Sequence, residues 1–228
     1  MEILMVLTSH GELGVTGYHT GFWLEEFTTP FYAIRDAGVE ITLASPQGGQ
    51  PPIDPRSGAR ESGIASLERF KADRDARALL GDTLRLEQID VTDFAGAYFP
   101  GGYGAMWDLG NDADCNALIR DFDVALKPIA FVCHAQAALV NVLDGSGRTL
   151  VTGRHLTCLS NTEELATGLS GSIPFLLQDE LIKLGALYSK ATDGRSHVVV
   201  DGTLITGQNL ASSHDTARAL LEAISVRR

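Results

Sequence analysis

Several patterns that would fix the class of this 228-residue protein are missing from its sequence. No apolar run reaches the roughly 20 residues of a membrane-spanning helix, and no secretory leader precedes the first predicted strand. Basic residues are few, since 18 Lys and Arg stand against 29 Asp and Glu, for a formal net charge of −11. This balance argues against nucleic acid and anionic membrane surfaces as partners, because both are bound through clusters of Lys and Arg.

Cofactor and disulfide motifs are missing as well. The three cysteines have no paired spacing that would indicate a disulfide framework or a zinc site, and the six histidines are scattered. The phosphate-binding patterns GxGxxG and GxxxxGK[ST] do not occur, and neither does the serine elbow GxSxG. We therefore expect no metal and no other cofactor, and a reducing cytoplasm as the location.

What is present is an alternation of short apolar runs with helical stretches. Strands are expected at 2–7, 39–44, 94–99 and 129–132, and helices at 22–37, 66–80, 111–126, 175–187 and 211–226. Pro30 should kink or restart the first of these helices. A hairpin is expected at 197–206, with Asp201 and Gly202 as its turn. The alternation predicts an α/β fold with a doubly wound, mostly parallel sheet between two helical layers, as one domain over residues 1–228.

The residues 127–140 (KPIAFVCHAQAALV) carry the main functional signal. An apolar strand runs directly into Cys133 and His134, and the Ala-rich segment that follows favours a helix. A strand that turns into a helix at a nucleophilic residue is the pattern of a nucleophile elbow. Amides at the start of the helix would favour the thiolate, so we expect Cys133 to ionise readily. The alternative is a buried cysteine that only fills space in the core.

Two further stretches are candidates for the same site. The strand at 94–99 ends in PGGYG, and adjacent glycines at the carboxyl end of a strand allow a ligand or another backbone to approach closely. Glu25 and Glu26 lie side by side on the first predicted helix and cannot both face one way. One of them is expected to point toward the strand ends, unless both are surface carboxylates.

With these residues in hand, the chain resembles the ThiJ/PfpI superfamily, and most closely its heat-shock-chaperone and glyoxalase III branch. The resemblance implies a flavodoxin-like, three-layer α/β fold of the class I glutamine amidotransferase type, and a homodimer. It extends over nearly the whole chain, and is carried by residues 20–26 (TGFWLEE), 43–49 (LASPQGG), 51–55 (PPIDP), 99–102 (FPGG), 106–109 (MWDL), 132–134 (VCH), 160–164 (SNTEE), 174–181 (PFLLQDEL) and 204–209 (LITGQN).

The resemblance also implies roles for particular residues. Cys133 would be the nucleophile with His134 as its partner, and Glu26 the acid that hydrogen-bonds the sulfur. Glu163, or its neighbour Glu164, would orient His134. Substrate-binding positions implied in the same way are Gly101, Gly102, Tyr103, Trp107 and Ala135.

Two of these positions depart from the family pattern. Residues 135–136 read Ala-Gln where the family usually has Gly-Pro or Gly-Gly, and this bears on the amides near Gly102 and Ala135 that would hold an oxyanion. Tyr103 stands where His is common, which bears on the choice of substrate.

The expected chemistry is the conversion of methylglyoxal or a related α-oxoaldehyde into a 2-hydroxy acid. Cys133 would form a hemithioacetal with the aldehyde. A carboxyl group near a thiolate is pushed toward its protonated form, so Glu26 could then move a proton between adjacent carbons. The alternatives are a cysteine peptidase or amidase, and a stress chaperone or redox sensor whose thiol is oxidised. A glutamine amidotransferase is disfavoured, because the late histidine lies in His214-Asp-Thr216 and not in His-x-Glu.

Overall fold

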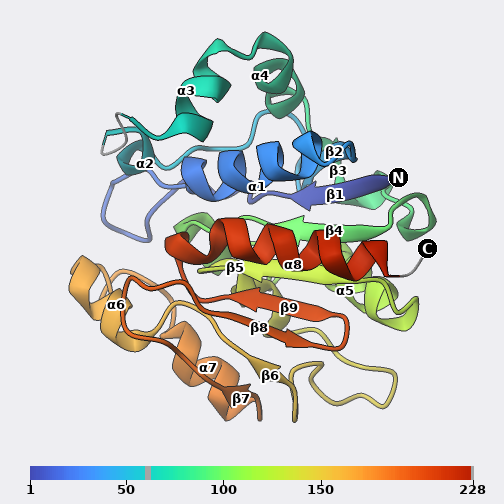
Figure 1. The fold of residues 1–228 in the computed structure, drawn as a ribbon. Helices are drawn as coiled ribbons and strands as arrows, with labels where there is room; N and C mark the ends of the chain where they lie inside the picture. The colour runs from blue at the N-terminus through green and yellow to red at the C-terminus, as the bar shows by residue number, and fades with distance from the viewer. Residues whose placement is uncertain (60–62, 227–228) are drawn as a thin grey trace.

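A seven-stranded sheet forms the centre of the protein in a computed structural model that describes residues 1–59 and 63–226. Every neighbouring pair is parallel except β8, which runs antiparallel to β9. A separate pair of short strands, β6 (His155–Leu156) and β7 (Leu187–Tyr188), lies below it in Figure 1. Across the main sheet the order is β3 (Leu84–Arg85), β2 (Glu40–Ser45), β1 (Glu2–Val6), β4 (Gly96–Phe99), β5 (Ile129–Val132), β9 (Leu204–Gly207) and β8 (Val198–Asp201).

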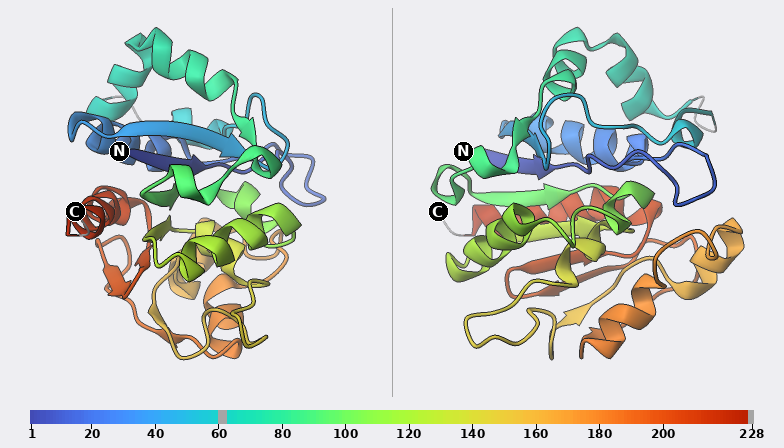
Figure 2. Two further views of the ribbon diagram at one scale, coloured as in Figure 1. Left: turned by 90° about the vertical axis from the view of Figure 1, so that its right-hand side faces the viewer. Right: turned by 180° about the vertical axis from the view of Figure 1, so that it is seen from behind.

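Helices cover both faces of this sheet. On one face α1 (Leu24–Asp36) and α8 (Ser213–Ser225) pack against each other, in front of the strands in Figure 1. On the other face lies α5 (Ala113–Val124), which is in front when the molecule is seen from behind (Figure 2, right). The predicted doubly wound sheet between two helical layers is confirmed.

Further helices lie outside these two layers' main helices: α2 (Pro55–Ala59), α3 (Ala65–Ala72), α4 (Arg74–Gly81), α6 (Asn161–Thr167) and α7 (Leu177–Lys183). Short 3₁₀ turns are η1 (Leu86–Gln88), η2 (Val91–Asp93), η3 (Tyr103–Met106), η4 (Ala135–Leu139) and η5 (Leu210–Ser212).

The central strands are apolar on both sides because both sides are covered. In β1, Leu4 and Val6 belong to the buried cluster on the α5 face, while Ile3 and Met5 belong to the cluster on the α1 face. This two-residue period is that of a strand whose side chains point alternately to opposite faces. A helical layer on each face therefore requires the continuous apolar runs that the sequence shows.

Two expected elements differ in detail. The helix expected at 66–80 is two helices. Asp73 ends α3 in an extended conformation, and its carboxylate then accepts a hydrogen bond from the amide of Ala76 as the N-cap of α4. In the hairpin, Asp201 is still paired with Leu204, so the turn is Gly202-Thr203, one residue later than predicted. Gly202 has a φ of +61°, a conformation that glycine adopts without strain.

No helix within residues 1–59 and 63–226 combines the length and the apolar character needed to cross a bilayer.

Candidate active site

The turn after β5 holds Cys133 in an unusual conformation. Its φ of +62° lies in the left-handed region, which costs a residue with a side chain about 1–3 kcal/mol. Backbone hydrogen bonds on both sides hold the turn in place: the Cys133 amide donates to Gly207 at 3.0 Å, and its carbonyl accepts from Leu159 at 3.2 Å. The predicted elbow is present. Strain of this kind directs the thiol out of the sheet at the carboxyl end of β5.

The segment after the elbow is shorter than expected. In place of an α-helix there is the five-residue 3₁₀ turn η4, and its side chains are buried. The side-chain amide of Gln136 donates to the carbonyls of Thr157 and Gly207, both at 2.9 Å. Gln136 therefore joins the elbow to two other parts of the chain. Because η4 is so short, it supplies little of the helix dipole that was expected to favour the thiolate.

Glu26 lies beside the thiol, on the buried side of α1. Only 2% of its surface is exposed, and its side chain is hydrogen-bonded to Cys133. The alternative in which both acids lie on the surface is therefore wrong for Glu26, whereas Glu25 does not line the cavity that contains the thiol. Gly101 makes room for this pair, since a Cβ there would lie 2.2 Å from Glu26 Oε2 and 2.8 Å from Cys133 Cβ.

This environment opposes ionisation of the thiol next to an ionised carboxylate. Burial raises the pKa of Cys133 well above its usual value, and the charge and hydrogen bond of Glu26 act in the same direction. The expectation of a readily ionised thiol, based on a helix N-terminus, is therefore wrong for Cys133 considered alone. Two acids in contact in a buried site lose their protons as a pair. A pair of this kind that carries one proton holds a thiolate only while that proton is on Glu26.

His134 and Glu164 complete a triad with the thiol. Nδ1 of His134 is 3.5 Å from the Cys133 sulfur, and its Nε2 donates to Oε2 of Glu164 at 2.6 Å. Tyr103 donates to the other oxygen of Glu164, also at 2.6 Å. Although burial alone would raise the pKa of Glu164, hydrogen bonds from His134 and Tyr103 hold it below the usual value. A fixed carboxylate therefore orients the imidazole, as in other Cys-His catalytic sites.

Glu163 has a different position from the one expected for it. The hydroxyl and amide of Ser160 donate to its carboxylate in a capping box at the start of α6, and Gln208 and Asn209 donate to it as well. Burial would raise the pKa of Glu163, but these hydrogen bonds lower it. Its side chain lines the cavity without a hydrogen bond to His134. Of the two acids left open by the sequence, Glu164 is the partner of His134, and naming Glu163 for that role was wrong.

These groups meet in a cavity of about 350 Å³. It is also lined by residues that were not predicted from the sequence: Trp23, Leu159, Thr167, Gly194, Asn209, Leu210 and Ala211. The predicted residues that line it are Glu26, Gly102, Tyr103, Cys133, His134 and Glu163.

Three predicted binding residues do not line the cavity. Gly101 and Ala135 are buried outside it, and Ala135 is fully buried. Trp107 is also outside, stacked on His10 with ring centres 5.0 Å apart. A tryptophan does line the cavity, but it is Trp23, at the start of α1.

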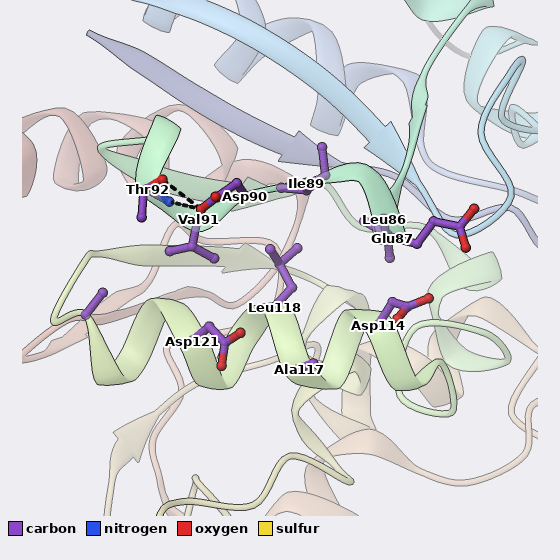
Figure 3. Close-up of a pocket in the computed structure, with 11 residues that line it drawn as sticks. Leu86, Glu87, Ile89, Asp90, Val91, Thr92, Asp114, Ala117, Leu118 and Asp121 are labelled. Atoms are coloured by element: carbon purple, nitrogen blue, oxygen red, sulfur yellow. Dashed lines mark hydrogen bonds between the residues drawn. The ribbon is translucent and has the colours of Figure 1, made fainter.

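A separate hollow of about 460 Å³ lies between η1, η2 and α5 and shares no residue with this cavity. Figure 3 shows Asp114 and Asp121 along α5, facing the segment that carries Glu87 and Asp90. No cysteine or histidine of the described residues lines this hollow.

Comparison with known proteins fits this geometry. Residues 18–223 match the DJ-1/PfpI family. The chain belongs to that family. Among curated DJ-1/PfpI-like relatives, the glutathione-independent glyoxalase hsp3101 of Schizosaccharomyces pombe is 28% identical over 97% of this chain and 95% of its own.

Two solved structures show how closely the fold is shared. Rapid Encystment Protein 24 kDa of Francisella tularensis superposes with a TM-score of 0.93 at 35% identity, over 98% of both chains. Glyoxalase III of Candida albicans superposes with a TM-score of 0.87 at 25% identity, over 98% of this chain and 97% of that one. The DJ-1/PfpI fold, and its arrangement over the whole length, are therefore shared with a glyoxalase.

Proposed function

We propose that this protein is a cofactor-independent glyoxalase that converts methylglyoxal and related α-oxoaldehydes into 2-hydroxy acids without glutathione. The observation that carries the proposal is the hydrogen bond between the Glu26 and Cys133 side chains inside one cavity. A Cys-His-Glu hydrolase needs only the triad, whereas this conversion also needs a group that moves a proton between adjacent carbons. The activities named for the yeast relative and for the Candida albicans structure support the same reaction.

The first steps use the shared proton of Glu26 and Cys133. With the proton on Glu26, the thiolate attacks the aldehyde carbon, a C–S bond forms, and Glu26 protonates the oxygen to give a hemithioacetal. Glu26, now a carboxylate, takes the proton from that carbon and returns it to the neighbouring carbon through an enediol. The hydroxyl proton passes to the neighbouring oxygen. One carbon is thereby oxidised to a thioester and the other is reduced to an alcohol, with no external electrons.

The last step is hydrolysis of the thioester. Water attacks its carbonyl carbon, and His134 accepts a proton of that water at Nδ1, the nitrogen that faces the sulfur. The C–S bond then breaks, the thiol recovers its proton, and the hydroxy acid leaves. Glu164 holds the imidazole in place and stabilises its charged form during this step. Methylglyoxal and water together give lactic acid, so atoms and electrons balance.

The test is a lactate assay with purified protein and methylglyoxal. We expect Cys133→Ala to abolish turnover, and Glu26→Gln to lower kcat by about 10²- to 10⁴-fold, because the amide cannot move the proton. Glu25→Gln and Cys158→Ala are matched controls outside the cavity, and both should retain activity. Wild-type protein that forms no lactate would refute the proposal.

A cysteine amidase or peptidase is the second candidate, because the triad of Cys133, His134 and Glu164 also fits that chemistry. The two activities differ in their need for Glu26. An amidase should retain turnover of a chromogenic amide in Glu26→Gln, whereas the glyoxalase should not retain lactate formation. Amide hydrolysis that survives in this variant, without lactate formation by the wild type, would favour the amidase.

The proposal also includes a cytoplasmic location and a homodimer, which rest on the sequence and on the family resemblance. Sedimentation analysis of the purified protein tests the dimer, and cell fractionation tests the location. A monomer across the micromolar range would remove that part of the proposal without affecting the chemistry.

A further inference from the structure

Asp54 and Arg56 form a rigid pair in the 51–55 (PPIDP) segment and the start of α2, which the reaction described so far does not use. Asp54 is fully buried and accepts the hydroxyl of Thr20 at 2.8 Å. The same carboxylate accepts the backbone amide and the Nε of Arg56, both at 2.9 Å, and a third contact comes from its Nη2. A planar guanidinium held at two of its nitrogens has little freedom to rotate. The direction of Arg56 is therefore fixed by a buried anchor.

The fixed guanidinium lies over Tyr103. Its Cζ is 5.1 Å from the centre of the Tyr103 ring, within the range of a cation–π contact. Tyr103 also contacts the triad, since its hydroxyl donates to Glu164 at 2.6 Å and its ring centre is 4.3 Å from that of His134. The same hydroxyl lies 3.0 Å from Oγ1 of Thr167. The position of this single ring therefore sets those of both the carboxylate and the imidazole.

Charge connects the same residues. The hydrogen bond to Asp54 raises the pKa of Arg56, and the charge of Glu164 contributes in the same direction. Arg56 is therefore close enough for its charge to stabilise the Glu164 carboxylate, which must remain ionised to hold His134. Arg56 also lines a hollow of about 540 Å³ that adjoins the cavity and shares Trp23, Tyr103, Glu163 and Thr167 with it. A direct contact with substrate is thus the alternative role.

We propose that Arg56, anchored by Asp54, is a positioning residue that acts on Cys133 through Tyr103, Glu164 and His134. It holds the ring and the carboxylate in the geometry in which the imidazole faces the sulfur. This role rests on the proposed function only for its turnover readout, since the reactivity of the thiol can be measured without an aldehyde.

The first test compares wild type with Arg56→Met, which keeps an unbranched apolar stem but removes the charge and the planar group. We expect kcat for methylglyoxal to fall about tenfold while KM stays within about twofold. The rate of Cys133 alkylation by iodoacetamide, followed by mass spectrometry, should fall by a similar factor. A change confined to KM would overturn the proposal, because it would make Arg56 a substrate contact.

The second test asks whether Arg56 acts through Glu164. In a double-mutant cycle on the alkylation rate, the effect of Arg56→Met should shrink to less than about twofold when Glu164→Gln is already present. An undiminished effect in that background would overturn the proposal. If Arg56→Met does not fold, Arg56→Lys takes its place in the cycle, since it keeps the charge but not the planar fork. The wild type could form no lactate while the double-mutant cycle still shows that Arg56 acts through Glu164. That result would refute the glyoxalase but support the positioning role.

The chain offers a matched control for this substitution. Arg69 is paired through two nitrogens with Asp36 and lies over the ring of Tyr32, with its Cζ 4.0 Å from the ring centre, away from the cavity. Arg69→Met removes the same kinds of contact from an exposed pair, so it controls for the loss of a paired guanidinium and of a cation–π contact away from the cavity. We expect Arg69→Met to leave kcat and the alkylation rate within about twofold of wild type. An equal loss in both variants would count against a specific role for Arg56.

Discussion

The hydroxyl of Tyr103 and the carboxylate of Glu164 are 2.6 Å apart, on the oxygen opposite the one that holds His134. A donor to each oxygen fixes the carboxylate against rotation. The orientation of the imidazole therefore depends on a phenol that touches neither the sulfur nor, in the proposed mechanism, the reacting carbons.

Removing that hydroxyl should shift the pH dependence of turnover. Tyr103→Phe keeps the ring but takes one donor from Glu164, and loss of a hydrogen bond to a carboxylate raises its pKa. We expect the acidic limb of the kcat profile to move to higher pH, and kcat at neutral pH to fall about tenfold, the size of one hydrogen bond to a charged group. The kcat of methylglyoxal turnover between pH 4 and 9 is the measurement. An unshifted acidic limb would show that Glu164 does not need this donor.

The shared proton of Cys133 and Glu26 should make the reactivity of the thiol nearly independent of pH. While the pair carries one proton, the fraction of thiolate depends on how the pair divides that proton and not on the pH of the solution. We expect the iodoacetamide rate to be flat around neutrality in the wild type, and to rise with pH along a single titration curve in Glu26→Gln. A sigmoidal rise in the wild type would mean that the two groups titrate independently.

Gly101→Ala should remove activity by displacing Glu26. The added Cβ would lie 2.2 Å from Glu26 Oε2 and 2.6 Å from the backbone oxygen of Val132, and the backbone cannot move aside easily. We expect kcat to fall by more than about 10²-fold, the contribution of a general acid–base group, and the melting temperature to fall as well. Gly171→Ala is the control, because nothing lies within 4 Å of its Cβ. Retained turnover in Gly101→Ala would show that Glu26 need not contact the sulfur.

Glu163 and Glu164 should separate into a stability role and a catalytic role. We expect Glu163→Gln to lower the free energy of unfolding at pH 7 by about 1–2 kcal/mol, because it removes charged hydrogen bonds from the start of α6. Since the folded pKa of Glu163 is lowered, its stabilisation is present above its unfolded value, near 4.5, and is lost as the pH falls through the folded value. The difference from wild type in urea unfolding should therefore shrink on acidification. Glu164→Gln should chiefly lower kcat, and the reverse pattern would contradict this assignment.

Much of the fold could be predicted because buried strands and helices require regular patterns of apolar residues in the sequence. Residues 3–7 are apolar without interruption, as a strand covered on both faces requires. Cys133 could be found because an apolar strand, a nucleophile and a small-residue segment follow one another directly. The identity of the buried acid on α1 came from the resemblance, because adjacent Glu25 and Glu26 have equal claims by composition.

The errors arose where a local side-chain hydrogen bond decides the structure. Asp73 divides one expected helix because its carboxylate caps the second half. The spacing of Ser160 and Glu163 is that of a capping box, which turns this acid back toward the helix start and leaves Glu164 to face the interior. This signal was present in the sequence and could have separated the two acids. The placing of Trp23 at the cavity, in place of Trp107, depends on how loops far apart in sequence pack together, and no local pattern records it.

The carbonyl of Gly207, at the end of β9, accepts both the amide of Cys133 and the side-chain amide of Gln136. The elbow is thus secured by residues that are made more than seventy positions after it. While the chain is being synthesised, the strand that carries the nucleophile exists well before the support that sets its strained geometry. The left-handed conformation of Cys133 therefore cannot be held in place until β9 has been made and has paired with β5.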